Sequence, residues 1–202
     1  AYVIDKADFS WNVSLNAARN TNKILAIDQV STSGILTGGI AGGVGNQVQI
    51  LQVGQPVNAF FVFQQKYGTN GLPLQDGVDH NDDGTVNQAD IYEDLNGDGR
   101  VNDLDKRPLE QPAPDLILGI SSQLNYKNFD LNFILRGNVG NYVYNNNASN
   151  YGYYDRIDER PGFVNNVHTS VLLTRFERPQ YFSDYYVEDA SFLRLDNITL
   201  GY

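Results

Sequence analysis

The side chains best suited to chemistry lie in one acidic stretch, residues 76–105, in which the same twelve-residue pattern occurs twice. Side-chain oxygens recur at positions 1, 3, 5, 9 and 12 of each copy, and glycine stands at position 6. The first copy begins at Asp79 and the second begins 15 residues later, at Asp94. Oxygen ligands at these positions, with glycine at the sharp turn, describe a calcium loop of the EF-hand kind.

The two copies provide two candidate ligand sets. Position 7 contributes its backbone carbonyl, so an arginine side chain there is no obstacle. Only three residues separate the copies, too few for the helix of a paired EF-hand, so the sequence predicts bare loops set end to end. The candidate calcium ligands are Asp79, Asn81, Asp83, Thr85, Asn87 and Asp90 in the first loop, and Asp94, Asn96, Asp98, Arg100, Asn102 and Asp105 in the second.

A cation is favoured because these carboxylates would otherwise repel one another. Two carboxylates about 5 Å apart repel by roughly 3 kcal/mol at a surface-like dielectric, and a divalent ion turns that repulsion into attraction. A cage of many protein oxygens suits Ca²⁺ better than Mg²⁺. We therefore expect structural Ca²⁺ that folds the loops. The alternative is a solvated acidic turn, since Asp, Asn and Gly all favour turns.

The charge of the chain is concentrated in this stretch. The 202 residues carry a net charge of −10, and residues 76–105 hold ten acids against Arg100 as the single base. The sequence has no basic patch, so nucleic acid is not an expected partner. The absence of cysteine excludes disulfide scaffolds and thiolate zinc sites. No apolar run is long enough for a transmembrane helix, and the lack of a signal peptide and of an initiating Met predicts an internal piece of a longer protein.

Residues 9–18 show the first clear strand pattern. Apolar side chains stand at the odd positions, and Ser, Asn or Ala stand at the even ones. This period of two predicts a strand, and residues 19–33 could extend it. The small neutral polar groups of the second face suit a wet lumen better than bulk water.

The strongest structural signal is a hairpin around Lys127-Asn128. Apolar and polar side chains alternate over residues 116–126 and again over 129–136. Tyr126 and Phe129 flank the turn and both belong to the apolar set, as the register of a two-residue hairpin requires. Each strand has about 11 residues, the length of a tilted membrane-spanning β-strand.

The remaining segments are predicted from their breakers and their phase. Residues 34–47 are Gly-rich without the spacing of a phosphate loop, so we expect a flexible loop. Residues 48–63 form an apolar run that Pro56 confines to a strand edge or a bend, and prolines keep residues 106–115 extended. In residues 191–202 the apolar phase switches, which predicts a strand with a bulge near Asp196-Asn197.

Residues 141–186 have no clear period and are rich in Tyr and Arg. A structureless run of this length argues against a small compact domain and fits a long loop of a barrel. Tyr and Arg are frequent at interface hot spots, and aromatic faces stack on sugar rings, so we expect some of them to contact substrate or a partner protein. The alternative is self-packing of the loop together with an interfacial tyrosine girdle. The candidate residues are Tyr142, Tyr144, Tyr151, Tyr153, Tyr154 and Arg156.

Four blocks, in order, carry a resemblance to a known family. They are VGQPVNAFFVF at 53–63, DLNGDGRVNDLDKR at 94–107, NYKNFDLNFILRGNVGNYVYN at 125–145 and VEDASFLRLDNITLGY at 187–202. Together they resemble the C-terminal barrel region of SusC-like (RagA-like) TonB-dependent outer-membrane transporters, and the resemblance spans nearly the whole chain. The last block is the most specific and the acidic block the least.

The resemblance implies an all-β fold: antiparallel strands forming part of a large transmembrane β-barrel, with long extracellular loops and a double Asp-rich calcium loop. Residues 1–202 would be a partial TonB-dependent receptor barrel, with the calcium-loop insertion at 76–105 within an extracellular segment and a long extracellular loop at 140–186. The short turn at Lys127-Asn128 would mark the periplasmic side.

The resemblance also implies a function and partners. The parent would import glycan or peptide oligomers through the bacterial outer membrane, in contact with its lipid, with a SusD-like surface lipoprotein as an outside cap. TonB would act through the parent's N-terminal region. The plug, the TonB-contacting segment and the strands that would close the barrel are missing from this sequence, so we expect the chain to be a fragment.

Two other functions compete with transport. A secreted calcium-binding β-sandwich, serving as a binding or adhesion module, accounts for the acidic repeat and the alternating strands but poorly for the neutral polar faces. An enzyme is not expected, because His80 and His168 both lie in polar loops without a visible Ser or Cys partner.

We expect the two faces of the predicted strands to meet different surroundings in the intact parent. The residues expected to face lipid are Phe9, Trp11, Val13, Leu118, Ile120, Leu124, Leu131, Phe133 and Leu135. The residues expected to face the lumen are Asn12, Ser14, Ser121, Gln123, Asn132 and Arg136.

Arginine scanning tests this assignment. Arg at Leu131, Phe133 or Leu135 should cost about 2–4 kcal/mol near the bilayer midplane, whereas Arg at Ser121 or Asn132 should be tolerated. Folding of the parent into lipid vesicles measures both. Equal tolerance on the two faces would contradict the assignment.

Overall fold

The computed structural model of the chain consists of two compact units. It describes residues 2–28, 34–40, 46–158 and 161–202. The first unit comprises Ala1–Asn22, Ala113–Tyr142 and Asp189–Tyr202, and the second comprises Lys23–Pro112 and Val143–Glu188. Within the described ranges, no helix combines the length and the apolar character needed to cross a membrane.

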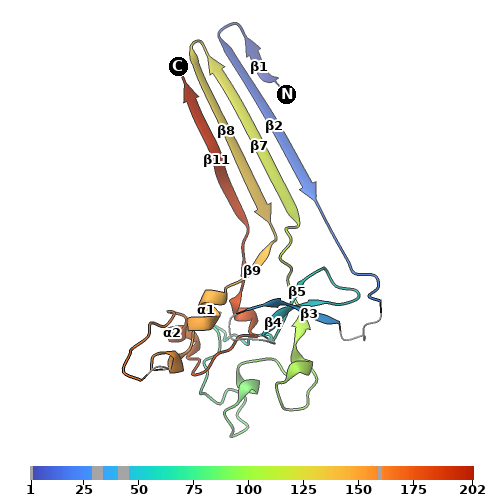
Figure 1. Cartoon of the computed structure of the whole chain (residues 1–202), viewed down its shortest axis with the longest axis vertical. Helices are drawn as coiled ribbons and strands as arrows, with labels where there is room; N and C mark the ends of the chain where they lie inside the picture. Colours follow the sequence, from blue (N-terminus) through green and yellow to red (C-terminus); the bar gives the residue numbers. More distant parts are fainter. Residues whose placement is uncertain (1, 29–33, 41–45, 159–160) are drawn as a thin grey trace. The chain divides into compact units, whose positions relative to one another are not determined.

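The first unit is built on a five-stranded antiparallel sheet in the order β1-β2-β7-β8-β11 (Figure 1). Two-residue turns join β1 to β2 and β7 to β8. The two turns meet at one end of the sheet, where the Lys127 N–H donates to the Asp8 carbonyl (3.0 Å). The strands are β1 (Tyr2–Lys6), β2 (Phe9–Arg19), β7 (Leu116–Tyr126), β8 (Phe129–Val139) and β11 (Phe192–Gly201).

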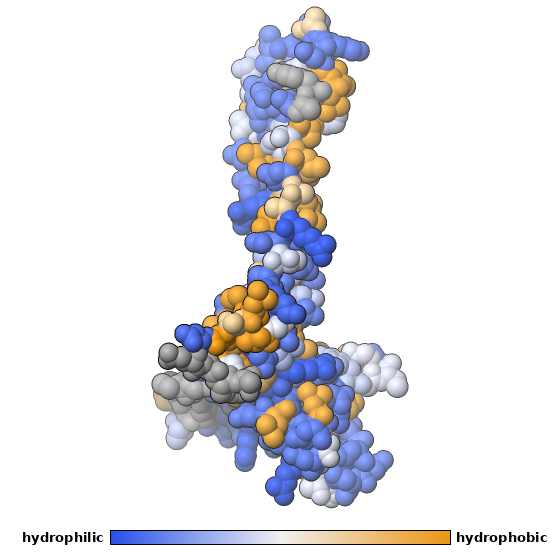
Figure 2. Space-filling view, turned by 90° about the vertical axis from the view of Figure 1, so that its right-hand side faces the viewer, coloured by the Kyte–Doolittle hydropathy of each residue, from blue (hydrophilic) through white to orange (hydrophobic). Residues whose placement is uncertain are grey.

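The register of this sheet places the apolar residues of neighbouring strands on one face. Phe9 pairs with Tyr126, and Tyr126 pairs with Phe129. One face is therefore apolar from strand to strand, and the other carries rows of polar side chains. Figure 2 shows hydrophobic residues along one side of the sheet and hydrophilic residues along the other. The predicted hairpin and the separation of its side chains into two faces are confirmed.

Strand β11 keeps its apolar residues on the same face by means of a bulge. Leu195 pairs with Leu135, but the next pairing joins Asn197 to Ile134, so Asp196 is an extra residue. Because one extra residue reverses the alternation, the apolar positions before and after the bulge face the same way. The bulge expected at this position is confirmed.

The bulge also neutralises a pair of like charges. Arg194 and Arg136 lie directly opposite each other on β11 and β8, an arrangement that is unfavourable by itself. Asp196 Oδ1 lies 2.6 Å from Arg194 Nε, and Asp196 Oδ2 lies 3.2 Å from Arg136 Nε. The extra residue thus supplies the carboxylate that both guanidinium groups need.

In the part of the chain that the structure describes, no large apolar side chain of this sheet is buried: Trp11, Leu124 and Phe133 are half-buried, and several others are exposed. Leu15, Leu193 and Leu200 are 68%, 69% and 73% exposed. Among the described residues, every buried apolar side chain belongs instead to the second unit. An exposed apolar face of this kind is typical of a surface that contacts another protein or lipid.

The second unit contains a four-stranded sheet in the order β3-β4-β5-β6. Val48 and Ile50 from β4 and Phe60 and Val62 from β5 are at most 2% exposed. The break expected at Pro56 falls in the loop between β4 and β5, as predicted. The strands are β3 (Ile35–Gly39), β4 (Gln47–Leu51), β5 (Ala59–Val62) and β6 (Arg107–Pro108).

Two predictions for the residues between β2 and β4 are wrong. Strand β2 ends at Arg19, and residues 20–28 form no strand, because Ile24 instead exchanges hydrogen bonds with the loop at Gly54 and Gln55. The Gly-rich segment contains strand β3, because pairing with β4 overrides the low strand propensity of glycine. The predictions for residues 29–33 and 41–45 fall outside the described residues.

The 141–186 segment is not the structureless run that was expected. Tyr153, Phe176 and Tyr186 pack in one buried cluster with Phe63 and Tyr92, so aromatic contacts distant in sequence replace periodic structure. Its described elements are all short: strand β9 (Tyr142–Tyr144), helices α1 (Asn146–Tyr151) and α2 (Val171–Thr174), and the 3₁₀-helices η3 (Tyr154–Arg156) and η4 (Asp184–Tyr186). Strand β9 pairs with β10 (Val187–Asp189), which follows the segment.

Candidate functional site

The acidic repeat folds into two loops that share most of their hydrogen bonds. The Gly84 N–H donates to Asp79 Oδ2 (2.9 Å), and the Gly99 N–H donates to Asp94 Oδ2 (2.7 Å). In both loops the position 5 N–H donates to the position 3 side-chain oxygen, at 3.1 and 2.9 Å. The position 7 N–H likewise donates to the position 5 carboxylate, at 2.7 and 2.9 Å. The sequence repeat is therefore a repeat of three-dimensional structure.

Position 12 forms the buried base of each loop. Asp90 and Asp105 are 1% and 0% exposed. Asp90 Oδ1 accepts from the His80 and Asn81 N–H groups (2.8 and 3.2 Å), and Asp90 Oδ2 accepts from the Asn87 N–H (2.8 Å). Burial alone would raise the pKa of Asp90, but these backbone donors lower it below its ordinary value. The carboxylate at the base of the loop is therefore ionised at neutral pH.

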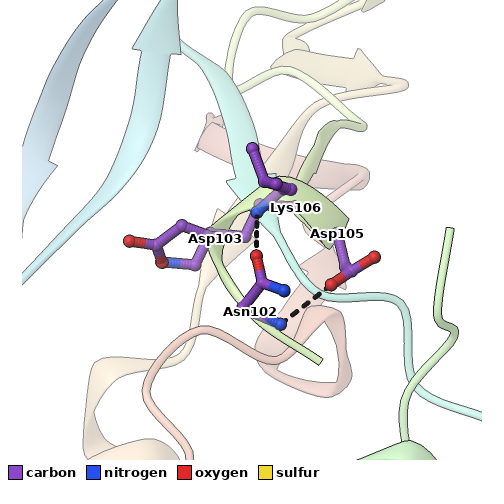
Figure 3. A network of polar contacts seen from close by, with 5 residues as sticks. Asn102, Asp103, Asp105 and Lys106 are labelled. Carbon is purple, nitrogen blue, oxygen red and sulfur yellow. Dashed lines mark hydrogen bonds and ion pairs between the residues drawn. The ribbon is translucent and has the colours of Figure 1, made fainter. Parts of the chain in front are cut away.

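Position 9 begins a short 3₁₀-helix that leads out of each loop. These helices are η1 (Gln88–Asp90) and η2 (Asp103–Asp105). In the second loop, Asn102 Oδ1 accepts from the Leu104 N–H (3.0 Å), while the Asn102 N–H donates to Asp105 Oδ2 (2.8 Å; Figure 3). The same capping box occurs in the first loop. The asparagine side-chain oxygen therefore accepts one hydrogen bond in the helix cap and keeps a second lone pair.

Two positions of each loop need a left-handed backbone. Position 6 is Gly84 (φ 82°) in the first loop and Gly99 (φ 78°) in the second. Position 4 is Gly97 (φ 71°) in the second loop but Asp82 (φ 59°) in the first. Aspartate is one of the few residues that enter this region readily, because its short side chain bonds to nearby backbone.

One observation fits a cation in the first loop. Asp79 Oδ1, at position 1, is buried and has no hydrogen-bond partner, whereas Oδ2 of the same carboxylate accepts from Gly84. Within the described residues, however, no three acidic or histidine side chains lie close enough together to form a metal-binding group. The candidate ligand atoms follow the expected order along each loop but do not converge on one point, so calcium binding remains a prediction.

Three of the tyrosine candidates lie partly or fully inside the protein. Tyr153 is 6% exposed and belongs to the aromatic cluster. Tyr144 is half-buried, and its hydroxyl donates to the Tyr181 carbonyl (2.6 Å). Tyr142 is half-buried in β9. For Tyr144 and Tyr153, self-packing accounts for the side chain.

The other aromatic candidates reach the surface. Tyr151 and Tyr154 are 36% and 37% exposed. The Arg156 guanidinium carbon lies 4.8 Å from the centre of the Tyr151 ring, a cation–π contact that keeps the two side chains together. Tyr151 and Tyr154, the exposed aromatic group, could be reached by a ligand or a partner, and the half-buried Arg156 lies against Tyr151.

The two histidines make local hydrogen bonds. His80 Nε2 lies 3.0 Å from the Gln75 carbonyl. His168 Nδ1 lies 2.9 Å from Ser170 Oγ and also accepts from the Ser170 N–H (3.2 Å), which is the geometry of a capped turn. Both histidines thus support the loops that contain them.

Comparison with known proteins decides the family. No family model matches the chain. The chain is 34% identical over 203 residues to the TonB-dependent receptor SusC of Bacteroides thetaiotaomicron, covering 96% of this chain and 18% of that receptor. It is 26% identical over 203 residues to the TonB-dependent receptor P3 of Formosa agariphila, covering 98% of this chain and 20% of that receptor. The chain belongs to the SusC-like TonB-dependent receptors.

Solved structures show the same fold for this SusC-like chain. A structure of the RagAB peptide transporter matches with a TM-score of 0.63 at 17% identity, over 98% of this chain and 21% of that one. The RagAB peptide importer in a closed-closed state gives 0.64 at 18% identity, over the same shares. The SusC-like chain therefore spans about a fifth of the length of the proteins it matches.

The SusC-like chain also contains a partly buried carboxylate, Asp184, that no local sequence motif predicts. Asp184 Oδ1 accepts from the Gln65 N–H (2.8 Å), 119 residues away. Burial raises the pKa of Asp184 to about 6, although the Gln65 N–H and the charge of Arg107 oppose the rise. Because the partners are so distant in sequence, only the structure brings this group to light.

The raised pKa of Asp184 predicts a pH dependence of stability. The folded-state pKa of about 6 exceeds the ordinary 3.8, so the folded state binds this proton more tightly than the unfolded state. The contribution of Asp184 to the free energy of unfolding therefore falls as pH rises from about 4 to 6 and stays low above, by at most about 3 kcal/mol.

Asp184→Asn removes this dependence while its side-chain oxygen can still accept from Gln65. The variant should melt at a higher temperature than the wild type at pH 7 and at a similar temperature at pH 4. Thermal unfolding of the parent in detergent measures both, with the exposed Asp155→Asn as the control. A lower melting temperature at pH 7 would contradict the argument.

Proposed function

We propose that this chain is the part of a bacterial outer-membrane transporter that contributes strands to the barrel wall and long extracellular loops. The parent imports glycan or peptide oligomers with TonB-derived energy and works with a SusD-like surface lipoprotein. The observation that carries the proposal is the five-stranded sheet, which has one apolar face, one polar face and large exposed side chains on the apolar one. A lipid bilayer on one side and a wet lumen on the other account for both faces.

Aromatic pairs at one end of the sheet support the membrane assignment. The rings of Phe9 and Tyr126 lie 6.3 Å apart, and those of Phe129 and Tyr202 lie 4.8 Å apart. Lys127 Nζ lies 5.5 Å from the Tyr126 ring centre. Aromatic residues with a nearby cation are typical of the level where a barrel strand leaves the hydrocarbon for the headgroups.

The comparisons support the transport class but not one substrate. RagAB is described as a peptide transporter, whereas SusC is described only as a receptor. We propose that Tyr151 and Tyr154, with Arg156 packed against Tyr151, contact substrate or the lipoprotein. Of the six candidates, Tyr151 and Tyr154 are the most exposed.

The alternative of a secreted β-sandwich explains less. A sandwich covers the apolar face of each sheet with a second sheet about 10 Å away. In this chain Leu193 and Leu200 on that face are 69% and 73% exposed. A soluble module would carry this surface into water at a cost of about 25 cal/mol per Å².

Deletion of the parent gene tests transport. The deletion strain should lose growth on one class of oligomer, glycan or peptide, and keep growth on the corresponding monomer. Uptake of the fluorescently labelled oligomer should also stop when the proton gradient that feeds TonB is dissipated. Unimpaired growth and uptake on both classes of oligomer would overturn the proposal.

We further propose that each acidic loop binds one structural Ca²⁺. The first loop would use Asp79, Asn81, Asp83, Thr85, Asn87 and Asp90, and the second would use Asp94, Asn96, Asp98, Arg100, Asn102 and Asp105. The unpartnered Asp79 Oδ1 supports this assignment in the first loop, whereas Asp94 Oδ1 of the second loop already accepts from the Gly97 and Asp98 N–H groups. The two ions would offset part of the charge of a stretch with ten acids and one base, and an affinity on the order of 10⁻⁴–10⁻³ M is sufficient outside the cell.

Two neighbouring aspartates give a matched test of calcium binding. Asp83 occupies ligand position 5 and Asp82 occupies position 4, so Asp83→Asn removes a ligand charge and Asp82→Asn removes the same charge from a position without a ligand role. Calcium should slow proteolysis between residues 76 and 105 of the parent in wild type and in Asp82→Asn. Asp83→Asn should need about ten-fold more calcium for the same protection.

The same proteolysis assay tests the identity of the ion and calcium binding itself. Magnesium at equal concentration should protect less than calcium, because it dehydrates reluctantly. Cleavage that proceeds at the same rate with calcium and with chelator would remove calcium from the proposal.

A further inference from the structure

The acidic segment, residues 76–105, contacts the second half of the 141–186 segment at points spread along the acidic segment. At its start, the Asp76 N–H donates to the Thr174 carbonyl (2.8 Å), and the Glu177 N–H donates to Asp76 Oδ2 (3.2 Å). In its middle, the Tyr92 hydroxyl donates to Gln180 Oε1 (3.3 Å). The contacts at Asp76 and Tyr92 therefore hold together two segments that lie far apart in the sequence.

The third contact is a lysine held between two aromatic rings. Lys106 Nζ lies 3.6 Å from the centre of the Phe182 ring and 5.1 Å from the centre of the Phe63 ring. Its side chain is only 10% exposed, and Nζ lies 2.9 Å from Asp103 Oδ1. A cation–π contact gains strength when the cation is withdrawn from water in this way.

These contacts continue to the exposed aromatic group. The Tyr154 N–H donates to the Phe176 carbonyl (2.9 Å), and the Asp155 N–H donates to the Glu177 carbonyl (3.0 Å). Glu177 is the residue whose own N–H is bound by Asp76. The start of the acidic segment and Tyr154 are therefore joined through residues 176–177.

We propose that residues 76–106 form a strap that holds residues 174–186 in place and thereby positions Tyr154. The strap is fixed to the chain beyond β5, because the Lys66 N–H donates to the Ile91 carbonyl (2.7 Å) and the Glu93 N–H donates to the Gln64 carbonyl (3.0 Å). Loosening the strap releases residues 174–186 as a local unit while the β4–β5 pair stays folded. Its consequence for substrate rests on the proposed role of Tyr151 and Tyr154.

A second anchor makes the strap testable. The Phe63 N–H donates to the Phe182 carbonyl (2.7 Å), and the Asp184 N–H donates to the Phe63 carbonyl (3.0 Å). If this anchor were sufficient, residues 174–186 would stay ordered without the strap. Variants that affect only the strap separate the two explanations.

Hydrogen exchange of the full parent transporter in detergent provides the measurement. Lys106→Met keeps most of the side-chain volume and removes the cation, and Asp76→Ala removes the carboxylate at the other end of the strap. Both should raise exchange over residues 174–186 and 153–156 by about ten-fold and leave residues 47–62 unchanged. The control is Asp82→Asn, which removes the charge of an exposed side chain of the same segment at a position without a ligand role.

Unchanged exchange over residues 174–186 in both variants would overturn the strap. Equal acceleration in Asp82→Asn would overturn it as well. If both main variants fail to fold, Tyr92→Phe, which removes only the hydroxyl bound by Gln180, must still accelerate the same peptides. The experiment uses no substrate, so a wrong role for Tyr154 would appear separately, as unchanged uptake in Tyr154→Ala.

Discussion

Side chains on a β-strand alternate between two faces, and the architecture of the first unit depends on keeping that alternation in step across four long strands. A slip of one residue would exchange the apolar and polar faces of a strand. The two short turns set the step between β1 and β2 and between β7 and β8. In β11 the step is kept by Asp196, which restores the apolar phase and neutralises two facing arginines. Asp196 therefore both keeps the strand register and neutralises the two facing arginines.

The features that the sequence predicts well are those set by local pattern. Alternation of apolar and polar residues predicts β2, β7 and β8, and the change of phase predicts the bulge near Asp196. The acidic loops belong to the same class, because their hydrogen bonds join residues at most ten positions apart. In each case the information needed lies within one short window of sequence.

The features that the sequence does not predict depend on distant partners. Strand β3 is Gly-rich and exists because β4 pairs with it. The aromatic cluster joins Phe63 and Tyr92 to Tyr153, Phe176 and Tyr186, so no single window contains its pattern. The same holds for Asp184, whose raised pKa arises from burial beside residues more than a hundred positions away. Long segments without a period can therefore be well packed, provided that other parts of the chain supply the partners.

The two acidic loops are alike inside and different at their exits. Each is closed by its own buried aspartate, but the first continues into the buried Ile91 and Tyr92, while the second continues into Lys106 between two rings. This is the form of a tandem repeat in which positions 1, 3, 5, 6, 8, 9 and 12 are the same, while residues at the other positions and after the loops differ. A self-contained loop can be gained or lost during evolution without disturbing the strands around it. Natural variation among related receptors should therefore change the number of whole loops more readily than their internal length.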